Sequence, residues 1–265
     1  MEVPEWNEFL LPYEQAVDEL VVKFRNLDSS FRKLNMVSPI ESVEGRVKKV
    51  SSMLEKAHIK GIPLDRLSEL MEDIGGVRII CRFVEDIERV LEIIRGRSGV
   101  DLEITKERDY ISNAKSSGYR SYHVIVSYPV ITAMGYKKVL CEIQIRTLAM
   151  NFWATIEHSL KYKYNGKIPD ELHGRLIICA EAASRLDSEM SAIRGELSEA
   201  QYVISTRTRL VDEILERIQA LQTVSHIEQI ARMNRTFFEL YESGDIEGLS
   251  SFNVELKGMM DTNRI

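Results

Sequence analysis

The stretch KVLCEIQIRT, residues 138–147, limits the possible folds of this chain most, because the polarity of its side chains alternates. Apolar side chains stand at every second position, at Val139, Cys141, Ile143 and Ile145. Between them lie Leu140, Glu142, Gln144 and Arg146. Successive side chains of a strand point to opposite faces of a sheet, so the pattern predicts a strand over 137–146 with one core face and one face for chemistry. A solvated edge strand shows the same alternation, and the pattern by itself does not separate the two.

Three more segments are expected to be extended. GVRIICRF, residues 76–83, is rich in β-branched side chains and follows the turn formers in DIGG, residues 73–76. Residues 101–108 and 121–129 also read as extended, and the polar residues 110–118 between them read as a loop.

Helical spacing, with apolar residues every three or four positions, covers most of the remaining chain. It predicts helices over 13–34, from about Val47 to Gly61, over 85–95 and over 147–164. From Asp170 onward the spacing is helical, with weak breaks near 200, 224 and 243. The mixture predicts an α+β core over about 35–165, flanked by helices, and a helical C-terminal part.

Composition excludes several classes of protein. The net charge of −6 argues against general nucleic-acid binding, which needs surplus Lys and Arg, so any polyanion site must be a local basic pocket. No stretch approaches the roughly 20 apolar residues of a membrane span, and the first residues lack the pattern of a signal peptide. The three cysteines are far apart, which argues against disulfides and zinc. We therefore expect a cytoplasmic protein.

Two acidic residues lie where a cation could bind. Asp73 precedes the 76–83 strand, and Glu142 lies on the polar face of the 137–146 strand. Neighbouring strands would bring the two carboxylates together, and they repel unless a cation lies between them or one is protonated. Arg78 and Arg82 share one face of the first strand. Mg²⁺ is the natural occupant of such a site.

Basic and aromatic residues predict anion and base contacts. In GRVKKVSSMLEK, residues 45–56, Lys48, Ser52 and Lys56 have helical spacing and could grip a triphosphate, although a solvated helix face has the same pattern. In the loop KSSGYRSYH, residues 115–123, flexible residues stand beside aromatic rings and side chains that can donate hydrogen bonds to phosphates. This mixture suits the stacking of a base together with phosphate contacts. Alternate tyrosines at the start of a strand, however, more often pack in the core or against a neighbouring strand. We expect Tyr122 to point into the core.

The helix over 147–164 has two faces. Its polar side, with Asn151, Thr155 and His158, is expected near the site. Its apolar strip is expected to pack, and consists of Leu148, Phe152, Ile156 and Leu160.

In order along the chain, GRVK, EDIGGVRI, SGYRSYH and EIQIRTLAMNFWATIEHSLKYKY closely resemble the alarmone synthetase domain of the RelA/SpoT homologue family, above all its small stand-alone members. The similarity runs from about residue 8 to about 200. It implies a nucleotidyltransferase-like mixed sheet flanked by helices. It also implies a GTP/GDP diphosphokinase of the stringent response, which moves the β,γ-pyrophosphate of ATP to the 3′-hydroxyl of GDP or GTP and gives ppGpp or pppGpp and AMP, with Mg²⁺ as cofactor.

The resemblance also implies roles for single residues. Glu142 matches the catalytic acid, and Asp73 matches the Mg²⁺ ligand, so both are expected at the metal. The residues matching the ATP site are Arg46 and Arg78, which sandwich adenine, and Lys48, Ser52 and Lys56 on the phosphates. Those matching the GDP or GTP site are Tyr119, which stacks on guanine, Lys115, His123, Gln144 and Asn151 in the pocket, and Arg108 on a phosphate.

At the level of the whole chain, the resemblance implies a synthetase domain over 1–200, a helical extension over 201–265 and a homotetramer. Some positions depart from the family. Ile59 stands where relatives often carry an arginine, and Ser42 and Glu44 replace an aromatic residue and a threonine of the product-activated branch, which argues against strong product activation. No His-Asp dipeptide of the alarmone hydrolase occurs.

Two other functions are compatible with the pattern. Toxic relatives pyrophosphorylate the 3′ end of tRNA, but the acidic balance and the complete Tyr119 pocket argue against this activity. A binding or scaffold protein without catalysis would have little reason to keep both Asp73 and Glu142. The sequence leaves open the preferred acceptor among GDP, GTP and GMP.

Overall fold

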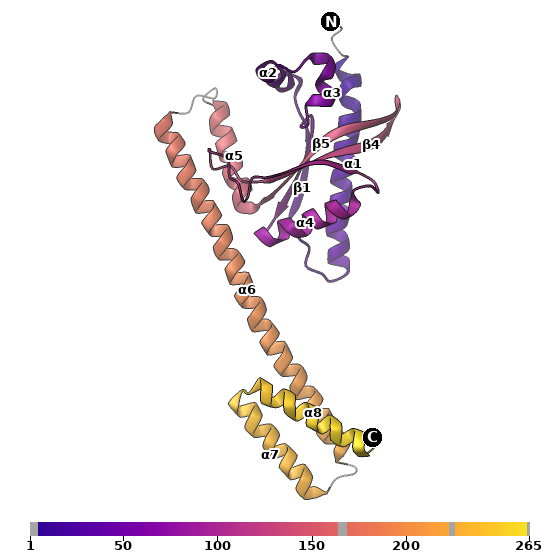
Figure 1. Cartoon of the computed structure of the whole chain (residues 1–265), viewed down its shortest axis with the longest axis vertical. Helices are drawn as coiled ribbons and strands as arrows, with labels where there is room; N and C mark the ends of the chain where they lie inside the picture. Colours follow the sequence, from indigo (N-terminus) through magenta and orange to yellow (C-terminus); the bar gives the residue numbers. More distant parts are fainter. Residues whose placement is uncertain (1–4, 164–168, 223–225, 264–265) are drawn as a thin grey trace. The chain divides into compact units, whose positions relative to one another are not determined.

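A mixed sheet of five strands lies at the centre of the N-terminal part (Figure 1). The computed structural model describes residues 5–163, 169–222 and 226–263. The strands lie in the order β1-β2-β5-β4-β3, and β2 and β5 run parallel while the other neighbours are antiparallel. Their bounds are β1 Ser42–Val47, β2 Gly75–Cys81, β3 Glu103–Asp109, β4 Tyr122–Thr132 and β5 Gly135–Thr147. The four predicted strands are thus confirmed, and β1 is an additional strand that ends where the helix was predicted to begin, at about Val47.

Helices precede, connect and follow the strands. Their bounds are α1 Trp6–Lys33, α2 Val50–Lys60, η1 Leu64–Arg66 (a 3₁₀ turn), α3 Leu67–Leu70, α4 Val84–Arg97, α5 Leu148–Lys163, α6 Asp170–Leu221, α7 Ile227–Ser243 and α8 Ile246–Asn263. α1 begins well before residue 13, because Trp6, Phe9 and Leu10 also pack against the core. α6 continues without a break near residue 200, so that part of the prediction is wrong. The predicted helix end at 164 and the predicted break at 224 lie outside the described residues.

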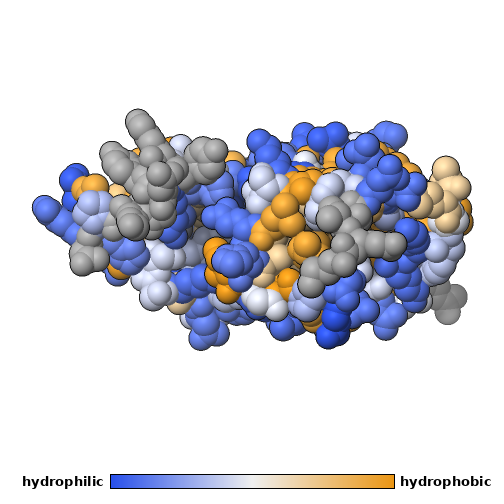
Figure 2. Space-filling view, turned by 90° about the horizontal axis from the view of Figure 1, so that it is seen from above, coloured by the Kyte–Doolittle hydropathy of each residue, from blue (hydrophilic) through white to orange (hydrophobic). Residues whose placement is uncertain are grey.

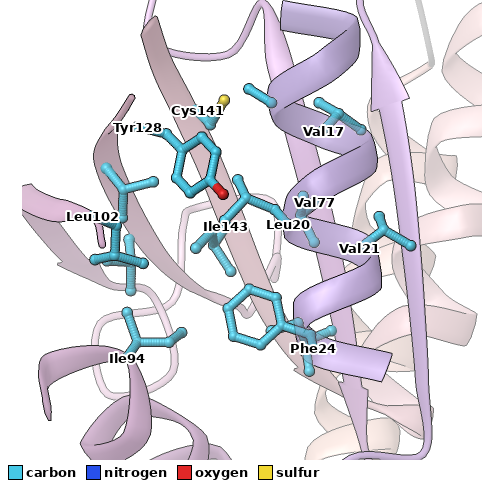
Figure 3. Close-up of a cluster of buried hydrophobic side chains, with 14 of the residues drawn as sticks. Val17, Leu20, Val21, Phe24, Val77, Ile94, Leu102, Tyr128, Cys141 and Ile143 are labelled. Carbon is cyan, nitrogen blue, oxygen red and sulfur yellow. The ribbon is translucent and has the colours of Figure 1, made fainter. Parts of the chain in front are cut away.

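The hydrophobic core lies on one face of the sheet. Figure 3 shows Val17, Leu20, Val21 and Phe24 of α1 packed over Val77 of β2 and over Cys141 and Ile143 of β5, with Tyr128, Ile94 and Leu102 beside them. The alternation in β5 therefore marks a core face, not a solvated edge, because β5 lies between β2 and β4.

Helix α1 approaches the sheet closely at Gly45 of β1. A Cβ atom added there would stand 2.5 Å from Val17 Cγ1 and 2.7 Å from Val21 Cγ2. Only glycine leaves room for this approach, since such short carbon–carbon distances are strongly repulsive. Gly45 thereby fixes β1 against α1, directly beside Arg46 of the polar face.

Thr147 fixes the start of α5, and the helix then buries a different side from the one that was predicted to pack. Thr147 Oγ1 accepts a hydrogen bond from the Met150 backbone N–H (3.1 Å), as an N-cap does, and donates to Asp187 Oδ2 (2.6 Å) of α6. α5 turns Met150 and Trp153 inward, and its predicted packing strip is largely exposed. The exposed fractions are 52% for Leu148, 70% for Phe152 and 46% for Ile156. Figure 2 shows hydrophobic residues at the surface of one face of the molecule.

The chain divides into two compact units, Met1–Ser191 and Ala192–Ile265. α6 contributes to both units. The second unit has its own hydrophobic cluster, formed by Leu210, Ile214, Ile218, Leu221, Met233, Phe237, Leu249, Phe252 and Leu256. In the part of the chain that the structure describes, none of the helices is long and apolar enough to cross a membrane.

Candidate active site

The polar face of the sheet carries most of the predicted site residues in two rows. Residues that pair in register on neighbouring strands point to the same face of a sheet. One row consists of Arg46, Gly76, Glu142 and Ile125. The next row consists of Glu44, Arg78, Gln144, His123 and Arg108. The fold thus brings together on one surface six residues that are far apart in the sequence and were predicted to act together: Arg46, Arg78, Arg108, His123, Glu142 and Gln144.

Asp73, which lies just before β2, is held by two lysines. Lys48 Nζ and Lys56 Nζ both donate to Asp73 Oδ2, at 2.7 Å and 2.6 Å. Burial alone would raise the pKa of Asp73, but these two hydrogen-bonded ammonium groups outweigh it and lower the pKa below its usual value. Asp73 is therefore an ionised carboxylate at neutral pH.

The lysines reach Asp73 by a route that the helical spacing did not predict. α2 begins at Val50, so Lys48 lies in the extended segment before the helix and does not share a helix face with Ser52 and Lys56. Its backbone N–H donates to Ile74 O (2.8 Å), which ties this segment to the start of β2. Ser52 is half-buried on α2.

Glu142 stands on the polar face with only 12% of its side chain exposed, and both of its oxygens accept hydrogen bonds. His123 Nδ1 lies 2.8 Å from Oε1, and Gln144 Nε2 donates to Oε2 at 2.7 Å. Burial would raise the pKa of Glu142, and the nearby Asp73 adds to this, but the bonds from His123 and Gln144 dominate and the pKa ends below its usual value. Glu142 is thus ionised and oriented.

The loop between β3 and β4 places Tyr119 beside these carboxylates. Gly118 has φ +86°, a left-handed conformation that favours glycine, and a Cβ atom there would lie 2.5 Å from Ala180 Cβ of α6. Tyr119 packs with the cluster of Trp153, Ala154 and Ala180. Its ring therefore leans on α5 and α6, while its hydroxyl points to His123 Nε2 (2.8 Å).

Basic residues surround the Tyr119 ring. Lys115 Nζ lies 4.9 Å from the ring centre and 4.4 Å from that of Tyr110, within cation–π range. Arg108 forms an ion pair with Glu72, which lies next to Asp73 in the chain.

Tyr122 was predicted to point into the core, and it does so only in part. Its ring packs against the core, but its hydroxyl donates to Glu107 Oε2 (2.6 Å).

Two hollows flank Gln144 and Tyr119. One, of about 370 Å³, is lined by residues that include Lys56, Asp73, Arg108, Lys115, His123 and Glu142. The other, of about 400 Å³, is lined by residues that include Arg46, Arg78, Arg146, Thr155, Glu157 and His158. The polar side of α5 therefore faces the site through Thr155 and His158. Asn151 lines neither hollow, and its buried Oδ1 lacks a hydrogen-bond partner among the described residues.

Sequence reasoning assigned no role to several residues of this surface. Arg146 stood on the polar face of β5 in the alternation pattern, and that position was the available signal. Glu72 and Tyr110 gave no signal of their own, because only the folded chain brings them to Arg108 and to His123. Arg82 was expected beside Arg78, but it lies beyond the end of β2 and pairs with Glu41.

The residues present fit a divalent cation. Asp73 and Glu142 border one small hollow together with Arg46 and Arg78. Asp73 Oδ1 is buried without a hydrogen-bond partner in the described residues. No group of three or more His, Cys, Asp or Glu side chains suited to a metal occurs there. Mg²⁺ is usually held by one or two carboxylates together with water and substrate phosphates, so this sparse donor set matches a cation bound jointly with a nucleotide.

Comparison with known proteins gives consistent matches. Residues 45–167 match the region found in RelA / SpoT proteins. The chain is 54% identical over 209 residues to the GTP pyrophosphokinase YjbM of Bacillus subtilis, and this matched stretch covers 79% of this chain and 98% of that protein. The small alarmone synthetase 1 from Bacillus subtilis bound to its product pppGpp has a TM-score of 0.70 and 55% identity, over 72% of this chain and 97% of that one. The same synthetase bound to AMPCPP has a TM-score of 0.64 and 51% identity, over 74% and 98%.

Proposed function

The chain belongs to the RelA/SpoT family, and we propose that it is a small alarmone synthetase that transfers the β,γ-pyrophosphate of ATP to the 3′-hydroxyl of GDP or GTP. The products are AMP and ppGpp or pppGpp, the alarmones of the stringent response. The observation that carries this proposal is that two ionised carboxylates, Asp73 and Glu142, line the same hollow as Tyr119 and several basic residues. The same two carboxylates border a small hollow with Arg46 and Arg78.

The ATP side is formed by arginines and lysines. Arg46 and Arg78 line the hollow of about 400 Å³ with α5, and their planar guanidinium groups suit stacking on adenine. Lys48, Ser52 and Lys56 are the proposed phosphate contacts. The two lysines already lie at Asp73, so triphosphate oxygens would compete with the Asp73 carboxylate for the same ammonium groups.

The acceptor side is the hollow lined by Lys56, Arg108, Lys115, Tyr119 and His123. Tyr119 is the proposed stacking platform for guanine, since its ring is held by packing against α5 and α6 and lines this hollow. Lys115 and Arg108 supply positive charge for the acceptor's phosphates. Gln144 lines this hollow. Asn151 lines neither hollow, and its place in the acceptor pocket is proposed from the family resemblance alone.

Chemistry is proposed at Glu142. Its ionised carboxylate acts as the general base that accepts the proton of the 3′-hydroxyl, which lets the oxygen attack the β-phosphorus of ATP. AMP leaves on the opposite side, in line with the attack. Asp73 and Glu142 would hold Mg²⁺, which when bound supplies neutralisation of the charge on the transferred phosphates. The protein's share is positioning, because Glu142 is already oriented by His123 and Gln144.

The test is a turnover assay with labelled ATP and, separately, GDP, GTP, GMP and tRNA as acceptors. We expect labelled ppGpp or pppGpp from the wild type. Glu142→Gln should lose about 10²–10³-fold in kcat while ATP still binds, because one preorganised charged group is lost. Glu103→Gln, an exposed glutamate on β3, is the matched control. A product formed with tRNA alone, or wild-type turnover of Glu142→Gln, would contradict the proposal.

We also propose a cytoplasmic homotetramer. A cytoplasmic location is supported by the substrates, since ATP and GTP are nucleotides of that compartment. Self-association is supported by an apolar groove in the first unit, whose lining includes Leu148, Phe152, Leu186 and Met190. The synthetase domain is proposed to be residues 1–200, with 201–265 as an extension. Mass measurement in solution tests the tetramer, and a monomeric wild type would contradict it.

A further inference from the structure

Five side chains of the site form a closed ring of hydrogen bonds. Arg146 Nη2 donates to Tyr119 Oη (2.6 Å) and to Gln144 Oε1 (2.7 Å). Tyr119 Oη lies 2.8 Å from His123 Nε2, and His123 Nδ1 lies 2.8 Å from Glu142 Oε1. Gln144 Nε2 closes the ring on Glu142 Oε2 (2.7 Å). Two paths thus lead from Arg146 to Glu142, one through the tyrosine and the histidine and one through the glutamine.

When His123 is a neutral imidazole, the two ends of the ring fix the direction of every bond in it. A guanidinium group only donates, and an ionised carboxylate only accepts. His123 must therefore carry a proton on Nδ1 to bond Glu142, and in the neutral imidazole Nε2 then accepts from the Tyr119 hydroxyl. Tyr119 in turn accepts from Arg146, and Gln144 accepts from Arg146 through its oxygen and donates to Glu142 through its nitrogen. The donors and acceptors match throughout.

Arg146 is buried and is also anchored by a residue outside the ring. It is 5% exposed, and its Nε donates to Ser121 Oγ (3.4 Å), a fully buried serine whose hydroxyl also donates to Ile145 O (3.2 Å). Its guanidinium carbon lies 5.1 Å from the centre of the Tyr119 ring. The arginine therefore contacts the proposed guanine platform both at its face and at its hydroxyl.

We propose that Arg146 is a positioning residue that locks the acceptor platform Tyr119 and the base Glu142 into one rigid unit, through Tyr119–His123 on one path and Gln144 on the other. This rests on the proposed function, because it assigns the ring to acceptor binding and to the attack of the acceptor hydroxyl. Preorganised contacts of this kind raise the rate by removing reorganisation when the substrate arrives. Arg146 thus acts through its neighbours and does not touch the reacting atoms.

The experiment compares Arg146→Met, Arg146→Lys and Tyr119→Phe in steady-state kinetics with ATP and GDP. Arg146→Met should lower kcat at least tenfold and raise the KM for GDP at least fivefold, with the KM for ATP changed less than twofold. Arg146→Lys, which keeps the charge and can still donate, should recover part of the loss. Tyr119→Phe keeps the stacking ring but opens one path, so its loss should be smaller than that of Arg146→Met.

Coupling separates positioning from a purely structural role. The double variant with Arg146→Met and Tyr119→Phe should lose at least threefold less than the product of the two single losses, because both changes open the same path. Arg95→Met is the matched control, since Arg95 also donates to a tyrosine hydroxyl, that of Tyr122 (3.3 Å), away from the ring. We expect it to leave kcat and both KM values within twofold of the wild type.

Three outcomes overturn the inference. A rise in the KM for ATP without a rise for GDP would make Arg146 a donor contact, and fully multiplicative losses would leave the two residues independent. If Arg146→Met does not fold, as judged by circular dichroism, Arg146→Lys and Tyr119→Phe carry the same comparison. The affinity for GDP in the absence of ATP is measured alongside by equilibrium dialysis. An unchanged GDP affinity in the variants would overturn the proposed role of Arg146. A wild type that makes no alarmone from ATP would instead overturn the proposed function.

Discussion

At the scale of single residues, the site depends on two carboxylates that are hydrogen-bonded before any substrate binds. Asp73 is held between two ammonium groups, and Glu142 between an imidazole and an amide. A buried carboxylate without such partners would take up a proton at higher pH. Both acids therefore keep their charge because of residues that the chain supplies from other elements.

Asp73→Asn tests this arrangement. We expect kcat to fall about 10²–10³-fold, since the substitution removes the charge that orders Lys48 and Lys56 and is proposed to hold the metal. The melting temperature should change by only a few degrees, because the pairs are partly exposed. Turnover and thermal melting are measured together. Asp65→Asn, which changes an exposed acid on the turn η1, is the control. A wild-type kcat in Asp73→Asn would contradict the proposed role of Asp73.

Residue patterns in the sequence predicted part of this site and missed another part for a physical reason. Alternation in one strand was enough to find Glu142, Gln144 and the polar side of Arg146, since the period of a strand is local. It could not find that Arg146 reaches Tyr119, because that contact depends on the path of a loop from another element. The pairing of Arg108 with Glu72 was missed for the same reason.

At the scale of elements, α6 supports the loop that carries Tyr119. Trp153 Nε1 of α5 donates to Leu176 O (2.9 Å), and Ala180 lies against Gly118. The proposed acceptor pocket therefore depends on the first turns of a helix that lies outside the strands bearing the proposed catalytic groups.

Gly118→Ala tests this support. An added methyl group meets Ala180 at 2.5 Å, and φ +86° is strained for any residue with a Cβ atom. We expect the KM for GDP to rise about tenfold, with the KM for ATP unchanged, as measured by steady-state kinetics. Gly96→Ala, where an added Cβ atom meets nothing within 4 Å, is the control and should behave like the wild type. An unchanged KM for GDP in Gly118→Ala would contradict this coupling.

A second link between elements is ionic. Asp101, which follows α4, pairs with Arg97 of α4 and with Lys23 of α1 (2.9 Å). The hydrogen bond from Arg97, followed by that from Lys23, lowers the pKa of Asp101 to about 2. A lowered folded-state pKa adds stability that is present above the unfolded value of about 4 and is lost as the pH falls toward 2.

Asp101→Asn should therefore destabilise the protein at pH 7 and have less effect in acid. We expect a loss of about 1 kcal/mol after allowing for solvent screening, or about 2–4 °C in melting temperature. The difference from the wild type should shrink between pH 4 and pH 2, as followed by urea unfolding at several pH values. A difference that grows as the pH falls would contradict this role.

Element boundaries show where sequence patterns lose information. The helices and strands were found because their periods differ, but α1 begins before residue 13 and α6 runs through residue 200. A helix continues through a weak break when each residue still forms backbone hydrogen bonds, which composition does not report. The exposed strip on α5 was mispredicted since an apolar stripe shows which side of a helix is apolar and not what covers it.

At the scale of the whole molecule, every residue of the proposed site lies in the first compact unit, Met1–Ser191. The site also needs the part of α6 in that unit, where Asp187 bonds Thr147 and Ala180 meets Gly118. The YjbM relative is matched over 98% of its own length by 79% of this chain.

Truncation separates these contributions. A chain of residues 1–200 should keep kcat and both KM values within about twofold, because it retains α6 through Ser191, whose hydroxyl donates to Glu85 (3.1 Å). A chain of residues 1–169 should lose the acceptor site, seen as a large rise in the KM for GDP or as loss of folding. Kinetics and circular dichroism are measured for both chains. Loss of activity in the longer chain would show that the second unit takes part in catalysis.

The separation of the two hydrophobic clusters has a consequence for how the gene can change. The hydrophobic cluster of the second unit, from Leu210 to Leu256, shares no residue with the cluster beneath the sheet. A genetic exchange within the stretch of gene that encodes α6 after Ser191 could replace the tail and leave every proposed catalytic contact as it was. The tail could therefore change in sequence without altering the proposed site.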